Sequence, residues 1–290
     1  MSRSWARSFD DVRESPERAR SFWLWTAGIA ATGFSVVLLA WLFHAREVVT
    51  GVLVVWLPWY AGSVMFVLTH LGMADTVQGV PHRRLLLPNG ISYLRLALAP
   101  LVLLPYVSLP LHPMIGWIYA SFLAGMLASD MLDGWVARRQ ENGTRLGRIL
   151  DLLGDLALLS FLAVGLHRVG AIPESLLWLL IARYPLMLIG VLVLYFARGP
   201  APISPTVIGR VTTFATSIVL LVIAVDFLFS ISWLPSFWID WSVWSLQFLI
   251  GANILYLLYR GAFWAASKEA VISTPDPASG AKRVASRHER

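Results

Sequence analysis

Eight apolar segments, each about 20 residues long, constrain this chain more than any other feature of its sequence. They fall at roughly 22–43, 48–70, 91–108, 114–131, 147–166, 176–197, 207–229 and 237–259. A helix of that length crosses the hydrocarbon core of a bilayer, where the backbone must satisfy its own hydrogen bonds. The sequence therefore predicts an all-α integral membrane protein with eight spans.

The composition excludes the main alternatives to a membrane protein. Of the 290 residues, 57% are hydrophobic and only 14% are charged, whereas an average soluble domain has about 25% charged residues. So few charges could not cover a soluble fold of this size, and a disordered chain would be far more polar. The chain has no cysteine, which excludes disulfides, thiolate metal sites and cysteine nucleophiles.

The distribution of basic residues predicts the orientation of the spans. With the N-terminus in the cytosol, 18 of the 23 Lys and Arg residues lie on the cytosolic side and only Arg46 and Arg168 lie outside. By the positive-inside rule, both termini are cytosolic. The same rule and the anionic lipid surface explain the net charge of +6, so no nucleic-acid partner is expected. We expect a cytosolic segment at 1–20 and a basic, disordered cytosolic tail at 265–290.

Four aspartates lie at the end of the fourth span and in the fifth. Asp130 and Asp133 are three residues apart and share one helix face, and Asp151 and Asp155 are four apart and share another. The link between the two spans is short, so we expect antiparallel neighbours whose carboxylate pairs meet at one depth. Each carboxylate near the membrane core costs about 2.5–3.5 kcal/mol, which implies compensation by a ligand or partner.

Such a quartet is a hard-oxygen site, which suits Mg²⁺ or Mn²⁺. Two metal ions about 3.5–4 Å apart could be bridged by it and could clamp a diphosphate. Gly134, Ala137 and Gly147 leave room for a bulky ligand beside the helices, and Arg138 can neutralise phosphate charge.

The full spacing, Asp-x2-Asp-Gly-x2-Ala-Arg-x8-Gly-x3-Asp-x3-Asp, resembles the signature of the CDP-alcohol phosphotransferase family. The resemblance covers about 84–262 and implies that family's six-helix core, preceded here by two additional transmembrane helices at 21–74. It also implies transfer of a phosphatidyl group from CDP-diacylglycerol to a hydroxyl acceptor with release of CMP, in a homodimer.

The resemblance assigns roles to the signature residues. Asp130, Asp133, Asp151 and Asp155 would bind the metal ions, and Asp155 would also be the general base for the acceptor hydroxyl. The positions that would contact the nucleotide are Gly134, Ala137, Arg138 and Gly147. Upstream, Pro88-Asn89-Gly90-Ile91-Ser92-Tyr93-Leu94-Arg95 resembles a segment that opens the core in many members. It would add Asn89 and Ser92 to the nucleotide site, although Pro88-Asn89 could equally be a turn that begins a helix.

Two arginines are candidates for binding the acceptor. Arg183 lies deep in the sixth segment and Arg210 at the cytosolic start of the seventh, and an intramembrane arginine is a functional candidate by default. Both positions resemble those that bind the acceptor phosphate in phosphatidylglycerophosphate synthases, which suggests glycerol 3-phosphate. Snorkelling to the interface, or for Arg183 an ion pair with the quartet, are the structural alternatives. The chain also departs from that subgroup, with Leu152, Leu156, Tyr184 and Thr212 at positions where other residues are usual.

Two other functions stay open at this level. A divalent-cation transporter could use the aspartates, but the outer halves of the spans are almost purely apolar and offer no pathway. A catalytically silent family member could serve as a scaffold. The favoured interpretation is an enzyme whose active site faces the cytosol. It would lie in the inner membrane if the cell is bacterial.

Overall fold

In the computed structural model, the described residues are 16–43, 46–71, 85–107, 113–140, 144–183, 207–229 and 235–273, and the elements within them are helices. In chain order these are α2 (Pro16–Phe43), α3 (Arg46–Thr69), α4 (Leu87–Leu98), the 3₁₀ helix η2 (Ala99–Leu103), α5 (Leu104–Val107), α6 (Pro113–Gln140), α7 (Arg145–Arg168), α9 (Val207–Phe229) and α10 (Ser236–Ser273). Residues 174–183 form a further helix.

Six of the described helical segments are long and apolar enough to cross a bilayer. This confirms the all-α integral membrane class. Of the eight predicted spans, the fourth falls within α6, where Gly116–Ser129 is apolar. The sixth continues past residue 183, outside the described residues.

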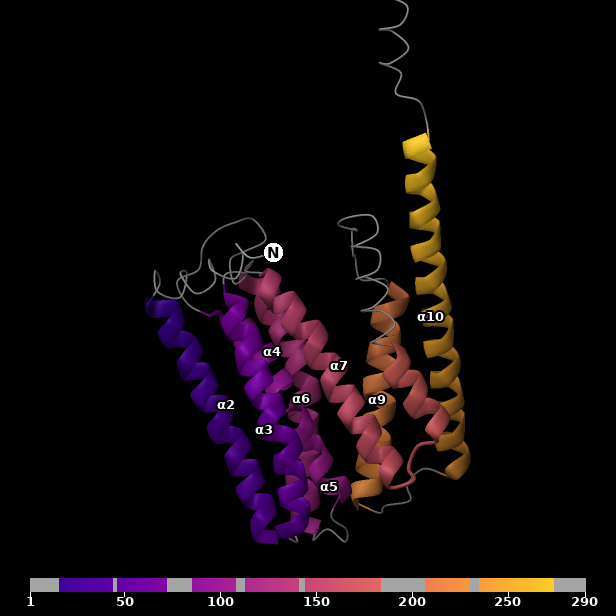
Figure 1. The fold of residues 1–290 in the computed structure, drawn as a ribbon. Helices are drawn as coiled ribbons and strands as arrows, with labels where there is room; N and C mark the ends of the chain where they lie inside the picture. The colour runs from indigo at the N-terminus through magenta and orange to yellow at the C-terminus, as the bar shows by residue number, and fades with distance from the viewer. Residues whose placement is uncertain are drawn as a thin grey trace, which may run out of the picture.

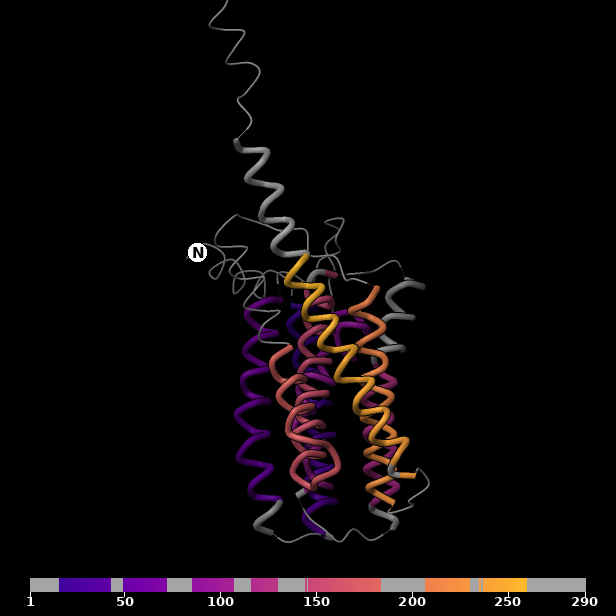
Figure 2. The backbone as a smooth tube through the Cα atoms, turned by 90° about the vertical axis from the view of Figure 1, so that its right-hand side faces the viewer, coloured from indigo at the N-terminus to yellow at the C-terminus, as the bar shows by residue number. Residues whose placement is uncertain are grey.

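Helix α4 is the centre of the bundle. It packs against α3, α6 and α7, with α2 and α3 on one side and α9 and α10 on the other (Figures 1 and 2). The span Leu87–Tyr106 is 78% buried, compared with 22% for Val49–Thr69 and for Phe237–Tyr259. The peripheral helices therefore present apolar faces that a bilayer can cover, while α4 is shielded by protein.

The contact between the two aspartate-bearing helices differs from the prediction. They were expected to be direct neighbours, but α6 and α7 contact each other little, and each packs much more extensively against α4. On the α7 side the approach depends on small residues, because a Cβ atom on Gly154 of α7 would lie 3.4 Å from the Ser92 carbonyl oxygen of α4. Asn89 and Arg95 both lie on the side of α4 that meets the α7 segment, where they contact Thr144 and Asp151.

Helix α10 is longer than its predicted span. It continues to Ser273 (yellow in Figure 1), and so reaches into the segment 265–290 that was expected to be disordered. The stretch contains Ala265, Ala266 and Ala270, and alanine is the strongest helix former. The remainder of the predicted tail, like the predicted segment 1–20 up to residue 15, lies outside the described residues.

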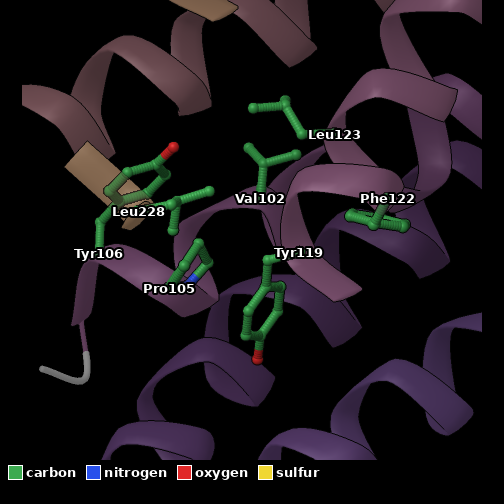
Figure 3. Close-up of a pocket in the computed structure, with 7 residues that line it drawn as sticks. All are labelled: Val102, Pro105, Tyr106, Tyr119, Phe122, Leu123 and Leu228. Atoms are coloured by element: carbon green, nitrogen blue, oxygen red, sulfur yellow. The ribbon is translucent and has the colours of Figure 1, made fainter. Parts of the chain in front are cut away.

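One small cavity lies at the end of the bundle that contains α5 (Figures 1 and 3). Its walls are apolar apart from two tyrosines, and the lining residues are Val102, Pro105, Tyr106, Tyr119, Phe122, Leu123 and Leu228. Its volume of about 10 Å³ has room for about one water molecule. The cavity is too small for a nucleotide or lipid.

Candidate active site

The second aspartate pair lies on α7 and faces a buried arginine of α4. The guanidinium of Arg95 forms an ion pair with Asp151, and its Nη2 lies 3.3 Å from Oδ1 of Asp155. The Arg95 side chain is fully buried, whereas the side chains of Asp151 and Asp155 are 45% and 23% exposed. A buried guanidinium needs anionic partners, and the four-residue spacing places both carboxylates within its reach. Their other sides remain accessible to a ligand.

Gly154 makes this close approach possible. A Cβ atom at residue 154 would lie 3.0 Å from Nε of Arg95, closer than packed carbon and nitrogen atoms normally come. The missing side chain therefore lets α4 and α7 bring Arg95 directly onto the α7 backbone beside Asp151 and Asp155.

The start of α7 is fastened to the start of α4. Thr144 is the N-cap residue of α7, and its Oγ1 accepts a hydrogen bond from the Gly147 amide at 2.9 Å. The same hydroxyl donates to Oδ1 of Asn89 at 2.9 Å. A Cβ atom on Gly147 would overlap Oδ1 of Asn89, so glycine here permits the contact. The geometry explains Gly147 as a close-packing position in addition to its predicted place near a nucleotide.

Asn89 and Ser92 differ in what they offer a ligand. Both are buried, but the Ser92 hydroxyl donates to the Pro88 carbonyl at 3.1 Å. The Nδ2 group of Asn89 has no hydrogen-bond partner within the described part of the chain. A buried amide donor is costly to leave unsatisfied, so Asn89 is the better candidate for a ligand contact.

The first aspartate pair is placed by its backbone only. Asp130 and Asp133 lie on α6, together with Gly134, Ala137 and Arg138, so the predicted helical spacing holds. The side chains of these five residues lie outside the described part of the structure. Among the side chains that are described, no group of three or more His, Cys, Asp or Glu residues could hold a metal ion. Asp151 and Asp155, whose oxygens converge on one guanidinium nitrogen, are the described part of a donor set that suits a hard cation.

The two predicted acceptor residues lie at one junction between helices. Arg183, the last described residue of the helix that begins at 174, is buried. Its Nη2 donates to Thr213 Oγ1 at 3.0 Å and to the Gly209 carbonyl at 3.3 Å. Arg210, which directly follows Gly209 on α9, is exposed. The structure therefore brings the two arginines to the same turn of α9.

Arg95 and Thr144 are the site residues that sequence reasoning missed. The Pro88–Arg95 segment contains Arg95, but the resemblance assigns it no role. Its place inside an apolar segment with no acidic residue of its own is a signal for a buried partner on another helix. Thr144 could have been found as a capping residue directly before a predicted helix.

Comparison with known proteins identifies the family. The family model described as CDP-alcohol phosphatidyltransferase matches residues 85–258. The chain belongs to the CDP-alcohol phosphatidyltransferase family. The match begins just before α4 and ends within α10, so it contains the four aspartates and excludes α2 and α3.

Relatives in the family have two kinds of name. A CDP-diacylglycerol–glycerol-3-phosphate 3-phosphatidyltransferase of Aquifex aeolicus is 32% identical over 152 residues, which cover 51% of this chain and 80% of that protein. A protein of the same name from Rickettsia bellii is 32% identical, over 33% of this chain and 52% of its own length. Human cardiolipin synthase (CMP-forming) is 32% identical, over 40% of this chain and 37% of its own length. No solved structure matches the chain. Family membership and these relatives support phosphatidyltransferase activity in phospholipid synthesis and favour an enzyme over a cation transporter.

Proposed function

We propose that this enzyme transfers the phosphatidyl group of CDP-diacylglycerol to the hydroxyl group of an acceptor, with release of CMP. The observation that carries this proposal is the convergence of Asp151 and Asp155 on Arg95 inside the family's matched range. The acceptor oxygen would attack the phosphorus atom bonded to diacylglycerol. The bond from that phosphorus to the bridging oxygen would break, and CMP would leave with the electron pair.

Asp155 is the proposed base for the acceptor hydroxyl. Its carboxylate is partly exposed, so an acceptor can reach it, and it is held in place by Arg95. A positioned carboxylate that takes the proton as the new bond forms contributes about 10²–10⁴ in rate. Arg95 would orient the carboxylate of Asp155, and the free Nδ2 group of Asn89 would donate to the nucleotide.

Asp130, Asp133, Asp151 and Asp155 would hold Mg²⁺ or Mn²⁺. When bound, two such ions would neutralise the diphosphate charge and stabilise the CMP leaving group. The carboxylate set fits these hard cations better than zinc or copper, which prefer nitrogen and sulfur ligands.

Glycerol 3-phosphate is the proposed acceptor. Arg183 bonds Gly209 and Thr213 on the turn of α9 that carries Arg210, and two guanidinium groups can bind a phosphate dianion. The name of the Aquifex relative agrees with this acceptor, whereas the name of the human relative favours a lipid alcohol. The high count of basic residues on one side supports an active site that faces the cytosol. A homodimer is proposed from the family resemblance alone.

CMP release by the detergent-purified chain tests the proposal. The assay contains CDP-diacylglycerol, Mg²⁺ or Mn²⁺, and one acceptor at a time: glycerol 3-phosphate, phosphatidylglycerol, inositol 1-phosphate, inositol, serine or choline. We expect CMP only with glycerol 3-phosphate and none after addition of EDTA. CMP with phosphatidylglycerol instead would replace the acceptor and keep the reaction class. No CMP with any acceptor, beside an active relative, would overturn the reaction class and favour the scaffold.

A further inference from the structure

The carboxyl end of α4 has an irregular backbone that helix α3 completes. Pro100 has no N–H group, so the Leu96 carbonyl lacks the donor that an α-helix would supply four residues later. The chain changes to the 3₁₀ helix η2 at Ala99. The indole Nε1 of Trp59, on α3, donates to the Leu96 carbonyl at 2.7 Å. In a bilayer, where no water can replace it, such a donor matters more than at a wet surface.

A second indole bonds the next carbonyl. Nε1 of Trp56, also on α3, donates to the Ala97 carbonyl at 3.1 Å. Trp56 is fully buried, and its ring meets Phe34 of α2 edge-on at 5.3 Å. A Cβ atom on Gly33 would overlap this ring, so Trp56 is tightly enclosed.

Trp59 also contacts α7. Its ring lies edge-on to Phe161, with the ring centres 5.1 Å apart and the planes at 89°. Phe161 follows Asp155 on α7 by less than two helical turns. A single side chain of α3 thus contacts the helix of Arg95 and the helix of its aspartate partners.

The amino-terminal half of α4 packs against α2. The ring of Trp25 lies where a Cβ atom of Gly90 would be, and Thr26 Oγ1 lies 3.3 Å from the Tyr93 hydroxyl. The Tyr60 hydroxyl of α3 donates to the Thr26 carbonyl at 2.8 Å, which joins α2 to α3. The helix pair therefore contacts α4 on both sides of Arg95.

We propose that Trp56 and Trp59 are positioning residues for the transfer reaction. They bond the two carbonyls that directly follow Arg95, and so keep its guanidinium on Asp151 and Asp155. Both tryptophans belong to α3, which lies outside the family match at 85–258. The catalytic part of this inference rests on the proposed function, because the reaction is the one proposed above.

The variants Trp56→Phe and Trp59→Phe remove the indole N–H and keep an aromatic ring. The matched control is Trp178→Phe, which also loses an indole hydrogen bond, to Glu174 at 2.9 Å, but on an exposed face of the helix 174–183. Pro100→Ala in the Trp59→Phe background is the rescue, because the alanine N–H can donate to the Leu96 carbonyl.

Two measurements on the full-length purified chain decide the question. Hydrogen–deuterium exchange measures the protection of the amides of residues 87–103, and it does so even if the protein has no enzymatic activity. Steady-state CMP release gives kcat and KM. We expect faster exchange in both variants, and kcat lower by about threefold to tenfold at an unchanged KM for CDP-diacylglycerol, as the loss of one buried hydrogen bond predicts. Trp178→Phe should change neither quantity, and Pro100→Ala should restore both in Trp59→Phe.

Three results would overturn the inference. These are unchanged exchange over 87–103 in Trp59→Phe, equal acceleration in Trp178→Phe, or faster exchange with an unaltered kcat. A double variant as slow as Trp59→Phe would contradict the role of the Leu96 carbonyl. If the wild-type chain releases no CMP while exchange changes as expected, the proposed function is contradicted. The stabilisation of α4 by the two tryptophans of α3 is then still supported.

Discussion

Arg95 of α4 contacts Asp155 of α7 at 3.3 Å, and its guanidinium is fully buried while the carboxylate is partly exposed. This asymmetry is what a reactive carboxylate needs, since one side is oriented by the protein and the other is open to an acceptor. Because Asp151 shares the same guanidinium, a change at residue 95 affects both carboxylates together.

Arg95→Ala should abolish most activity and lower stability. It removes the cation that orients two carboxylates, and we expect a loss in kcat of about 100-fold or more. The unfolding free energy should fall by about 1–3 kcal/mol, less than for a fully buried pair because water can reach both aspartates. Arg95→Lys should retain part of the activity and part of the stability. CMP release and thermal unfolding in detergent measure these effects, with the exposed Arg20→Ala as control. Wild-type kcat in Arg95→Ala would contradict the assigned role.

Asn89→Ala and Thr144→Val should separate ligand binding from helix capping. Loss of the unpartnered Nδ2 group should raise the KM for CDP-diacylglycerol by about tenfold. Thr144→Val leaves that group in place but removes the N-cap of α7, and should cost about 1 kcal/mol of stability. Steady-state kinetics and thermal unfolding of both variants test this. Equal KM changes in the two would mean that Asn89 acts only through Thr144.

Gly147→Ala should reduce both activity and stability. Its methyl group would overlap Oδ1 of Asn89 and crowd the Thr144 hydroxyl, so α4 and α7 would have to separate at their starts. We expect a loss of about 1–3 kcal/mol, as for other overpacked sites. Gly251→Ala on α10 is the control, because a Cβ atom there would meet nothing within 4 Å. A Gly147→Ala variant as stable as Gly251→Ala would contradict the close contact.

The signature predicted which helices carry the aspartates, but not the packing around them. The spacing of Asp151 and Asp155 was sufficient to place both on one helix face, since that follows from helix geometry alone. The position of α4 between α6 and α7 could not be predicted, because it depends on close approaches such as that of Gly154 on α7 to Arg95 on α4. A proline at residue 100 is enough to predict that the α-helix is interrupted there. That the indole of Trp59 donates to the Leu96 carbonyl could not be predicted, since no local pattern links residues so far apart in the chain.

Arg183→Ala should raise the KM for the acceptor more than the KM for CDP-diacylglycerol. Loss of charge-assisted hydrogen bonds to a phosphate predicts about a tenfold increase with glycerol 3-phosphate. Thr213→Val, which removes one hydrogen-bond partner of Arg183, should have a smaller effect of the same kind. The exposed Arg168→Ala, at the far end of α7, is the control. Equal increases in both KM values would end the assignment of Arg183 to the acceptor.

The most direct test of the proposed chemistry is the rate of metal-dependent CMP release by Asp155→Asn. Asparagine keeps the size of the side chain and an oxygen for Arg95, but it cannot take a proton from the acceptor. We predict a rate at least about 100-fold below wild type, with a thermal unfolding temperature close to that of wild type. Asp240→Asn, which changes an exposed carboxylate of α10, should remain fully active. A wild-type rate in Asp155→Asn would contradict the assignment of Asp155 as the base.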